Sequence, residues 1–184
     1  FAAVSSAQVH LLKTNIIRVE VDLSKGLNAF SIVGLPDKAV QEAKDRIAAA
    51  IKNTGFKSPK QKNHKVVISL APADVKKEGT LFDLPMAVGY LIASKCLPAD
   101  VRNMLFIGEL SLDGAVQPVD GVLPIVRKAK QSGFGEVYVP EGNAKEAALI
   151  DGIDVYGVRN LRDLSAHLAK KDILQDEDRP FIQR

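Results

Sequence analysis

Side chains able to do chemistry gather in one stretch of this sequence, residues 70–86, where two prolines, one glycine and five charged residues separate apolar segments. Polar loops held between buried elements often carry binding or catalysis, so these carboxylates and lysines could move protons or bind a ligand. Alternatively, they pair with one another and with backbone amides and only fix the loop. The carboxylates are Asp74, Glu78 and Asp83, and the lysines are Lys76 and Lys77. We favour the structural interpretation, because ion-pair networks that perturb pKa values are often purely structural.

Familiar motifs for phosphate, dinucleotide, zinc and serine-hydrolase chemistry are absent: G-x-x-x-x-G-K-[ST], G-x-G-x-x-G, H-E-x-x-H and G-x-S-x-G. The three histidines, His10, His64 and His167, are far apart and lack metal-ligand spacing, so we expect no metal site. The single cysteine, Cys96, excludes an internal disulfide and indicates a reducing cytoplasm. No apolar run reaches about 18 residues, so we expect no membrane-spanning helix.

Two groups of basic residues are candidates for contact with nucleic acid, which the formal net charge of +3 permits but does not demand. The first group is Lys57, Lys60, Lys62 and Lys65, and the second is Arg127, Lys128 and Lys130. The first group lies in an expected loop and the second on an expected helix. Because no aromatic side chains for base stacking alternate with the loop lysines, we favour a solvated connection over a phosphate-binding loop.

The hydrophobic pattern predicts an α+β fold in one domain, hairpin-rich in its first half and alternating between helix and strand in its second half. Strands are expected at residues 1–10, 16–23, 29–33, 66–70, 104–110, 115–119, 136–139 and 153–156. Helices are expected at residues 37–53, 84–94, 120–132, 143–150 and 161–168.

Turn and cap residues mark the ends of these elements. Lys25-Gly26 is interpreted as a hairpin turn, and Asp113-Gly114 as a two-residue type I′ turn. Asp37 suits the positive end of a helix dipole, and Gly55 suits a helix C-terminus. Asn143 and Asn160 are expected to cap the N-termini of the last two helices.

Taken together, these residues resemble the magnesium-chelatase-like AAA+ proteins, the family of competence protein ComM and YifB. The resemblance covers about residues 4–170, in order and with family-like spacing. The blocks that carry it are Ile32-Val-Gly-Leu-Pro-Asp37 with Ala39-Val40, Glu42 and Arg46; Asn53-x-Gly55-Phe56; Leu70-Ala-Pro-Ala-Asp74, Lys77-Glu-Gly79 and Phe82-Asp-Leu-Pro85; and Gly108-Glu-Leu-Ser-Leu-Asp-Gly114, Pro118-Val119, Gly121-Val122 and Val139-Pro140 with Asn143, Glu146 and Ala147.

The resemblance implies a fold like the catalytic domain of Lon protease, which is related to domain 2 of ribosomal protein S5. It places a Lon-like domain at residues 1–169 and a charged tail or linker at residues 170–184, leading towards a AAA+ ATPase module absent from this sequence. That module would use ATP and magnesium, and no cofactor is expected in this chain itself. The implied partners are the chain's own AAA+ module, neighbouring subunits in a hexameric ring, and DNA, all in the cytoplasm and without a membrane.

Lon-type proteases use a serine nucleophile and a lysine that accepts its proton. By resemblance, Leu81 stands at the serine position and Ile125 at the lysine position. Neither side chain can attack a carbonyl or transfer a proton, so the resemblance implies an inactive site filled as core. A shift of one residue would bring Thr80 to the nucleophile position, and Pro124 or Val126 to the lysine position, where the dyad still fails.

Three functions are compatible with this sequence. We favour a non-catalytic Lon-like domain of a AAA+ protein, which supports ring assembly and guides DNA. One alternative is a peptidase with an unrecognised nucleophile such as Thr80 or Ser69, for which the sequence offers no convincing base. Another is a stand-alone S5-like module that binds nucleic acid. Polar residues of the family blocks could also bind a partner domain or ligand, namely Asp74, Lys77, Glu78, Asp83, Glu109 and Asp120, and Gly79 belongs to the same family-motif loop.

Overall fold

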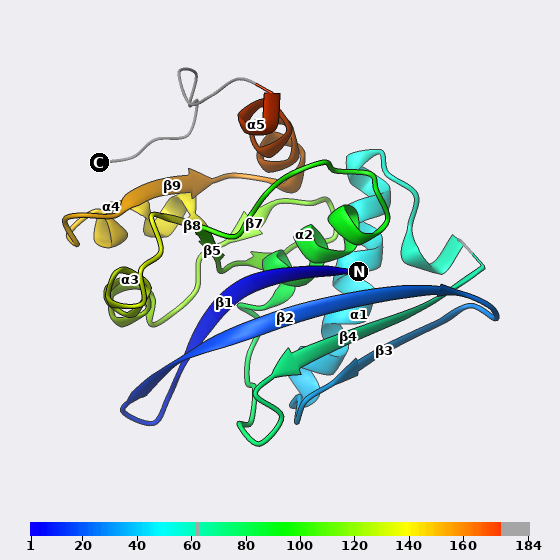
Figure 1. Cartoon of the computed structure of the whole chain (residues 1–184), viewed down its shortest axis with the longest axis horizontal. Helices are drawn as coiled ribbons and strands as arrows, with labels where there is room; N and C mark the ends of the chain where they lie inside the picture. The colour runs from blue at the N-terminus through cyan, green and yellow to red at the C-terminus, as the bar shows by residue number, and fades with distance from the viewer. Residues whose placement is uncertain (62, 174–184) are drawn as a thin grey trace.

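The architecture is a mixed β-sheet with helices against both faces, as given by a computed structural model that describes residues 1–61 and 63–173 (Figure 1). Within these residues, seven strands form one sheet in the order β3-β4-β2-β1-β5-β8-β9, and β6 and β7 form a second, two-stranded sheet. The strands are β1 (Ala2–His10), β2 (Lys13–Lys25), β3 (Ala29–Val33), β4 (His64–Ala71), β5 (Met104–Phe106), β6 (Glu109–Leu110), β7 (Val116–Gln117), β8 (Glu136–Pro140) and β9 (Asp154–Val158). The helices are α1 (Lys38–Thr54), α2 (Asp83–Ala93), α3 (Val122–Gln131), α4 (Ala144–Ala147) and α5 (Leu161–Ile173), with 3₁₀ turns η1 (Pro59–Gln61) and η2 (Glu141–Asn143).

The large sheet is mainly parallel, and its antiparallel part is the β1–β2 hairpin with β4 beside it. β1 pairs with β2 along its whole length, from Ala2 opposite Val21 to His10 opposite Lys13. β4 is antiparallel to β2 and parallel to β3, and β1, β5, β8 and β9 run parallel to one another in that order. The alternating second half follows the sequence prediction, whereas the β1–β2 hairpin was not predicted.

The hairpin predicted at Lys25-Gly26 is wrong, because β4 lies between β2 and β3. Ile68 of β4 is opposite Val21 of β2 on one side and opposite Ile32 of β3 on the other. β4 alternates buried and partly exposed side chains, as expected for an inner strand with one face against the core. The turn signal correctly shows that the chain bends, but it does not show which strand will pair there.

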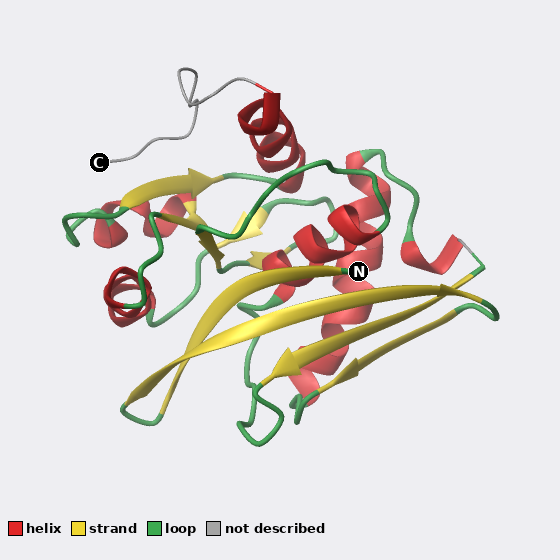
Figure 2. Ribbon diagram, viewed as in Figure 1, coloured by secondary structure: helices red, strands yellow, loops and turns green. Residues whose placement is uncertain are grey.

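Helices lie against both faces of the sheet (Figure 2), and an apolar cluster on each face holds them in place. On one face, with α1, α2 and α5, the rings of Phe106, Tyr138 and Tyr156 from three neighbouring strands stack with centroids 4.8 and 4.7 Å apart. On the other face, α3 and α4 cover Leu105 and Val137. Successive residues of a strand point to opposite faces, so Leu105 and Phe106 belong to different clusters.

Helix α1 begins and ends where the sequence predicts. Asp37 Oδ1 accepts a hydrogen bond from the Val40 N–H at 2.8 Å and caps the first turn. At the other end, Gly55 adopts a left-handed φ of 100°, and its N–H bonds to the carbonyl oxygens of Ile51 and Lys52. The predicted inward face is buried: Val40, Ala43, Ile47, Ala50 and Ile51.

Helix α2 is buried on all sides at the centre of one apolar cluster. Its residues from Asp83 to Leu91 are all buried, and it packs on β1, β2 and α1. A helix that is apolar all round belongs to a protein core or to a membrane. α2 has only 11 residues. In the described part of the chain, no helix is both long enough and apolar enough to cross a membrane.

The strand predicted at residues 104–110 is two strands, β5 and β6, in different sheets. At the break, the Gly108 N–H donates to the Leu81 carbonyl oxygen at 2.9 Å, and the Gly108 carbonyl oxygen accepts from the Leu84 N–H at 3.0 Å. A Cβ on Gly108 would lie 2.7 Å from Cγ1 of Val116, so a side chain does not fit. The break directs the chain from the main sheet towards the start of α2.

The turn between β6 and β7 has three residues, 112–114, enclosed by Ser111 and Ala115, so the predicted two-residue turn at Asp113-Gly114 is wrong. The Ser111 N–H donates to the Ala115 carbonyl oxygen, and the Gly114 N–H donates to the Ser111 carbonyl oxygen, both at 2.9 Å. This is the pattern of a type I turn followed by one left-handed residue. Gly114 is that residue, with φ 92°.

The helix predicted at residues 143–150 is shorter, and its expected cap has another role. Asn143 makes no side-chain cap to α4, which ends at Ala147. Asn143 Oδ1 instead accepts from the Val119 N–H at 2.9 Å, and Nδ2 donates to the Val119 carbonyl oxygen at 3.1 Å. Asn143 therefore fixes the segment that joins β7 to α3.

The final helix is longer than the sequence predicts. Asn160 caps α5 as expected, with Oδ1 accepting from the Asp163 N–H at 2.8 Å. α5 continues to Ile173, so residues 170–173 are helical rather than part of a tail. Lys171, in the last turn, pairs with Glu136 at the start of β8 at 2.8 Å. The remainder of the predicted tail, residues 174–184, lies outside the described residues.

Candidate functional site

The loop between β4 and α2, residues 72–82, is fixed against the segment that leads into α1. The Lys77 N–H donates to the Leu35 carbonyl oxygen at 3.0 Å, and the Asp37 N–H donates to the Lys77 carbonyl oxygen at 2.9 Å. Asp37 Oδ2 also accepts from the Gly79 N–H at 3.1 Å. One carboxylate therefore caps α1 with one oxygen and holds the loop with the other.

Lys77 is fully buried inside this loop. Its ammonium group donates to the Gly34 carbonyl oxygen at 2.7 Å and to the Pro72 carbonyl oxygen. Burial lowers the pKa of Lys77, and the Asp74 carboxylate opposes that effect. A lysine with a lowered pKa resembles a catalytic base. Here, however, the group is directed at two carbonyl oxygens that hold the loop closed, so its geometry is that of a structural residue.

Gln8 binds the same loop from the side of β1. Its Nε2 donates to the Lys76 carbonyl oxygen at 2.6 Å, and its Oε1 accepts from the Glu78 N–H at 3.2 Å. The side chain is only 2% exposed although it lies near the end of a strand. Sequence reasoning missed Gln8, and no local signal distinguishes it, because β1 also contains the polar residues Ser5, Ser6 and His10.

Asp83, at the start of α2, is buried and paired with Arg46 of α1. Arg46 Nε donates to Asp83 Oδ2 at 2.7 Å and Nη2 donates to Oδ1 at 3.0 Å, while the Leu110 N–H donates to Oδ2 at 3.0 Å. Burial raises the pKa of Asp83, and the bonds from Arg46 and Leu110 oppose that rise. The prediction that a lysine pairs with Asp83 is wrong, although Arg46 already belonged to a quoted family block.

A cleft of about 450 Å³ opens beside this loop, beyond the carboxyl ends of the neighbouring parallel strands β1 and β5. Ligands of open α/β sheets usually bind at this edge. The cleft has apolar walls and two carboxylates. It is lined by Val9, Gly79, Thr80, Leu81, Glu109, Pro118, Val119, Asp120 and Gly121. Of the predicted polar residues, the structure therefore brings Gly79, Glu109 and Asp120 together at one site.

Thr80 and Glu109 form a direct hydrogen bond in this cleft. Thr80 Oγ1 donates to Glu109 Oε2 at 2.6 Å, and both side chains are partly buried. The two residues are 29 positions apart, and the break in the strand at Gly108 is what brings Glu109 to the loop. The sequence offered no base for Thr80, whereas the structure supplies a carboxylate.

The two positions that the resemblance assigns to the Lon dyad are apolar, and both belong to or pack against the same cluster. Ile125 of α3 is fully buried on the face of the sheet that α3 and α4 cover. Leu81 is partly exposed to the cleft and packs against that cluster as well as against the one around α2. An apolar contact therefore occupies the region where the resemblance would place a hydroxyl and an amine.

The remaining predicted residues lie outside this site. Asp74 is exposed, and Glu78 is near Lys76, with Glu78 Oε1 3.5 Å from Lys76 Nζ, and near His10, with Oε2 3.6 Å from Nδ1. Glu78 thus pairs with Lys76, as the structural interpretation predicts. In residues 1–61 and 63–173, no three His, Cys, Asp or Glu side chains gather to hold a metal ion.

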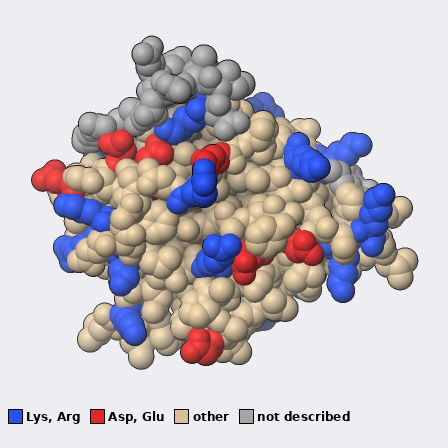
Figure 3. Space-filling model, in the orientation of Figure 1, with Lys and Arg blue, Asp and Glu red and all other residues tan. Residues whose placement is uncertain are grey.

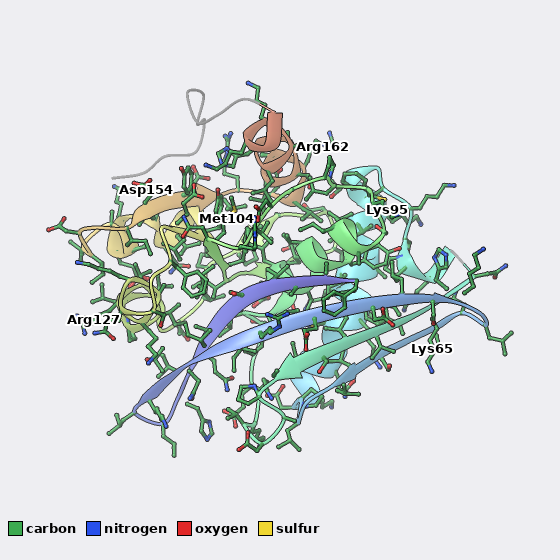
Figure 4. All side chains as sticks on the ribbon, in the orientation of Figure 1. Lys65, Lys95, Met104, Arg127, Asp154 and Arg162 are labelled. Carbon is green, nitrogen blue, oxygen red and sulfur yellow. The ribbon has the colours of Figure 1, made fainter. Side chains whose placement is uncertain are left out.

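The two basic groups lie at opposite ends of the molecule and do not form one surface. Lys65 is on β4 and Arg127 is on α3, on opposite sides of the view in Figure 4. Basic and acidic side chains are interspersed over the face in Figure 3. Lys60 pairs with Asp45 at 2.5 Å, and Lys62 lies outside the described residues. Of the others, Lys57, Lys65, Arg127 and Lys130 are exposed and Lys128 is partly buried.

Comparison with known proteins places these features in a family. The model of the family described as "Subunit ChlI of Mg-chelatase" matches residues 19–143. Competence protein ComM of Haemophilus influenzae is 40% identical over 150 residues, which is 81% of this chain and 29% of that protein. The chain belongs to this magnesium-chelatase-like family. The family member YifB of Escherichia coli, described as uncharacterized, is 39% identical over 160 residues, which is 86% of this chain and 31% of YifB.

Membership of the magnesium-chelatase-like family confirms the family resemblance found in the sequence. The chain spans 29–31% of the length of ComM and YifB, the curated relatives named above. Lon protease 2 of Bacillus subtilis is also similar, with 35% identity over 95 residues, which is 50% of this chain and 17% of that protease. The similarity to Lon is therefore partial, whereas the similarity to the magnesium-chelatase-like family covers most of the chain.

Proposed function

We propose that this chain is a non-catalytic, Lon-like domain of a longer AAA+ ATPase of the ComM and YifB type. In this proposal it supports assembly with neighbouring subunits in a ring and adds weak contacts to DNA. The single observation that carries the proposal is that Leu81, which lines the cleft, packs against the apolar cluster that contains the buried Ile125. By the resemblance, these are the two positions of the Lon dyad. The mixed sheet and the partial similarity to Lon protease 2 support the Lon-like part of the proposal.

In this proposal, ATP is bound and hydrolysed by the AAA+ module and not by the present chain. The chain contains no G-x-x-x-x-G-K-[ST] motif, so its residues do not form a phosphate-binding loop of that kind. ATP and magnesium would be used by the AAA+ module, and this domain would influence that chemistry only through its position in the assembly.

A peptidase that uses Thr80 is the second candidate function. It is favoured by one observation, the 2.6 Å hydrogen bond from Thr80 Oγ1 to Glu109 Oε2 in an open cleft. A carboxylate that accepts a hydroxyl proton is one way to activate a nucleophile. Two features oppose this function: the buried lysine Lys77 is directed away at carbonyl oxygens, and Leu81 is the neighbouring side chain in the cleft.

The first prediction is that the chain neither cleaves unfolded casein nor reacts with a fluorophosphonate probe. The reason is that a hydroxyl nucleophile needs both a base and a path to the substrate carbonyl, and Leu81 occupies the expected place. Cleavage is measured by gel and labelling by in-gel fluorescence, with intact Lon-type protease as the positive control.

Three variants decide between the candidate functions. Thr80→Ala removes the cleft hydroxyl, and Thr54→Ala is the matched control, because Thr54 Oγ1 only donates to the Ala50 carbonyl oxygen at the end of α1. Cleavage or labelling that survives Thr54→Ala and is abolished by both Thr80→Ala and Glu109→Gln would establish the peptidase and overturn the non-catalytic proposal.

The DNA part of the proposal rests on the exposed basic residues at the two ends of the molecule. Lysine presents a point charge, which suits phosphate and is poor at bidentate recognition of bases. Pairing with Asp45 reduces the charge that Lys60 offers. Binding by one copy should therefore be weak and independent of sequence, and an assembled ring would strengthen it by multiplying the contacts.

The second prediction is a steep loss of DNA binding as salt rises. For about three phosphate contacts, the slope of log K against log salt should be roughly −3 for duplex DNA, with marginal affinity at physiological salt. Fluorescence anisotropy with duplex and branched DNA measures this slope. The variants are Lys57/Lys60/Lys62/Lys65→Ala and Arg127/Lys128/Lys130→Ala, and each should reduce the slope. Salt-insensitive or sequence-selective binding would contradict the proposal.

A further inference from the structure

The turn between β1 and β2 carries two exposed leucines where a tight turn usually carries glycine or asparagine. Leu11 and Leu12 are 85% and 104% exposed; among the large apolar side chains of the described residues, Leu12 is the most exposed and Leu11 ranks third, after Leu27 at 92%. Leu11 has φ 56°, in the left-handed region. A positive φ in a two-residue hairpin turn favours glycine, asparagine or aspartate, because they adopt it without steric cost. The turn is thus both strained and apolar, and neither property stabilises a single copy of this domain.

The turn also projects beyond the body of the domain. In Figure 1 the ends of β1 and β2 extend past the neighbouring elements, with the turn at the lower left of the view. Val9, two residues before Leu11, is 38% exposed and lines the cleft described above. A projecting apolar turn therefore lies immediately beside an open cleft with apolar walls.

Charge is complementary between the turn and the cleft. Lys13 follows the two leucines, is exposed, and forms no ion pair with any other described residue. In the cleft, Asp120 is exposed and Glu109 is partly buried. An occupant with adjacent leucines and one lysine would bury its apolar side chains against Leu81, Val119 and the other apolar walls, and place its ammonium group near carboxylates.

We propose that the β1–β2 turn of one copy of this chain enters the cleft of a second copy. Leu11 and Leu12 would lie against the apolar walls, and Lys13 would pair with Asp120 at the rim. Because turn and cleft adjoin at the end of β1, the contact forms in both directions about a two-fold axis and closes as a dimer. This contact uses only the present domain, so it does not depend on the proposed DNA or ATPase roles.

The proposal is tested by sedimentation equilibrium of the chain from about 1 μM to 1 mM, a range that covers moderate to weak association. Wild type is expected to dimerise within this range. Leu12→Asp should raise the dissociation constant at least ~100-fold, because a reciprocal dimer buries this side chain twice. Leu149→Asp is the matched control, since Leu149 is 72% exposed and follows α4. It should leave the dissociation constant unchanged.

Charge reversal tests the pairing of turn with cleft. Lys13→Glu and Asp120→Lys should each weaken the dimer, and the double variant Lys13→Glu/Asp120→Lys should restore much of the affinity. Thermal unfolding of every variant checks folding, which these exposed positions should not affect. A double variant that is weaker than both single variants would show that the two residues do not meet.

Mixing two single variants distinguishes this contact from a turn-to-turn contact. Leu12→Asp keeps an intact cleft, and Asp120→Lys keeps an intact turn, so the mixture should form heterodimers through one complete contact. In a turn-to-turn contact Asp120→Lys alone would dimerise like wild type, because its turn is intact, and the proposal would fail. A wild type that stays monomeric to about 1 mM would also overturn it and would leave the cleft to a different partner.

Discussion

Replacing Arg46 with alanine is expected to lower the free energy of unfolding by about 3–5 kcal/mol, the range found when one partner of a buried ion pair is removed. The variant leaves the Asp83 carboxylate 1% exposed, with the Leu110 N–H as its remaining donor among the hydrogen bonds described above. Urea unfolding followed by circular dichroism measures the change. Arg18→Ala is the matched control, because Arg18 pairs with Glu20 at the surface and should contribute no more than about 1 kcal/mol.

The stability that Arg46→Ala loses should depend on pH in a definite direction. Burial already raises the pKa of Asp83, and removing Arg46 removes the strongest effect that opposes this rise. A carboxyl group with a raised folded-state pKa binds its proton more tightly in the folded state, so lowering the pH favours folding. The deficit of Arg46→Ala relative to wild type should therefore shrink as the pH falls towards the pKa of Asp83.

A double variant separates charge burial from lost packing. Arg46→Leu/Asp83→Leu removes both charges and keeps apolar volume at the site, so it should recover most of the stability that Arg46→Ala loses. If Arg46→Ala unfolds at the same urea concentration as wild type, then the ion pair is not the main support of the α1–α2 contact. A pH-independent deficit would show that Asp83 is not the group left unpaired.

Local signals in the sequence predicted both ends of α1 and the start of α5, because these caps are satisfied within a few residues. Asp37 needs only the Val40 N–H, and Gly55 needs only the last carbonyl oxygens of α1. The apolar spacing along α3 likewise predicts its buried face, including Val122 and Ile125. These features depend on the 3.6-residue period and on backbone geometry, which a single segment already contains.

Contacts between distant segments could not be predicted from such signals. β4 enters between β2 and β3 after a helix of 17 residues, so the order of the strands depends on packing of the whole sheet. Gln8 and Lys76 are 68 positions apart, and Thr80 and Glu109 are 29 apart. The cleft is assembled from such pairs. The family blocks contained Thr80's neighbours and Glu109, yet their spacing in the sequence does not indicate that a hydroxyl meets a carboxylate.

The last expectation concerns Gly34, between β3 and α1, where the chain passes the end of β4. Gly34→Ala should lower the free energy of unfolding by roughly 2–6 kcal/mol, the sum of backbone strain and forced displacement of a packed neighbour. Its φ is 106°, and an added Cβ would lie 2.1 Å from the Leu70 carbonyl oxygen. The Gly34 carbonyl oxygen also accepts a hydrogen bond from Lys77 Nζ, so a shift of this backbone would disturb the loop beside the cleft.

Gly55→Ala is the matched control for Gly34→Ala, because it measures the cost of the left-handed backbone conformation without a steric clash. Gly55 has a similar φ of 100°, and an added Cβ there would have no heavy atom within 4 Å. The free energy of unfolding of this variant should fall by about 1–2 kcal/mol, the usual penalty of a left-handed conformation for an L-residue. Urea unfolding of both variants, measured side by side, gives the difference that the contact with Leu70 contributes. Equal losses at the two glycines would show that β4 yields to the new methyl group and that Gly34 is required only for its φ.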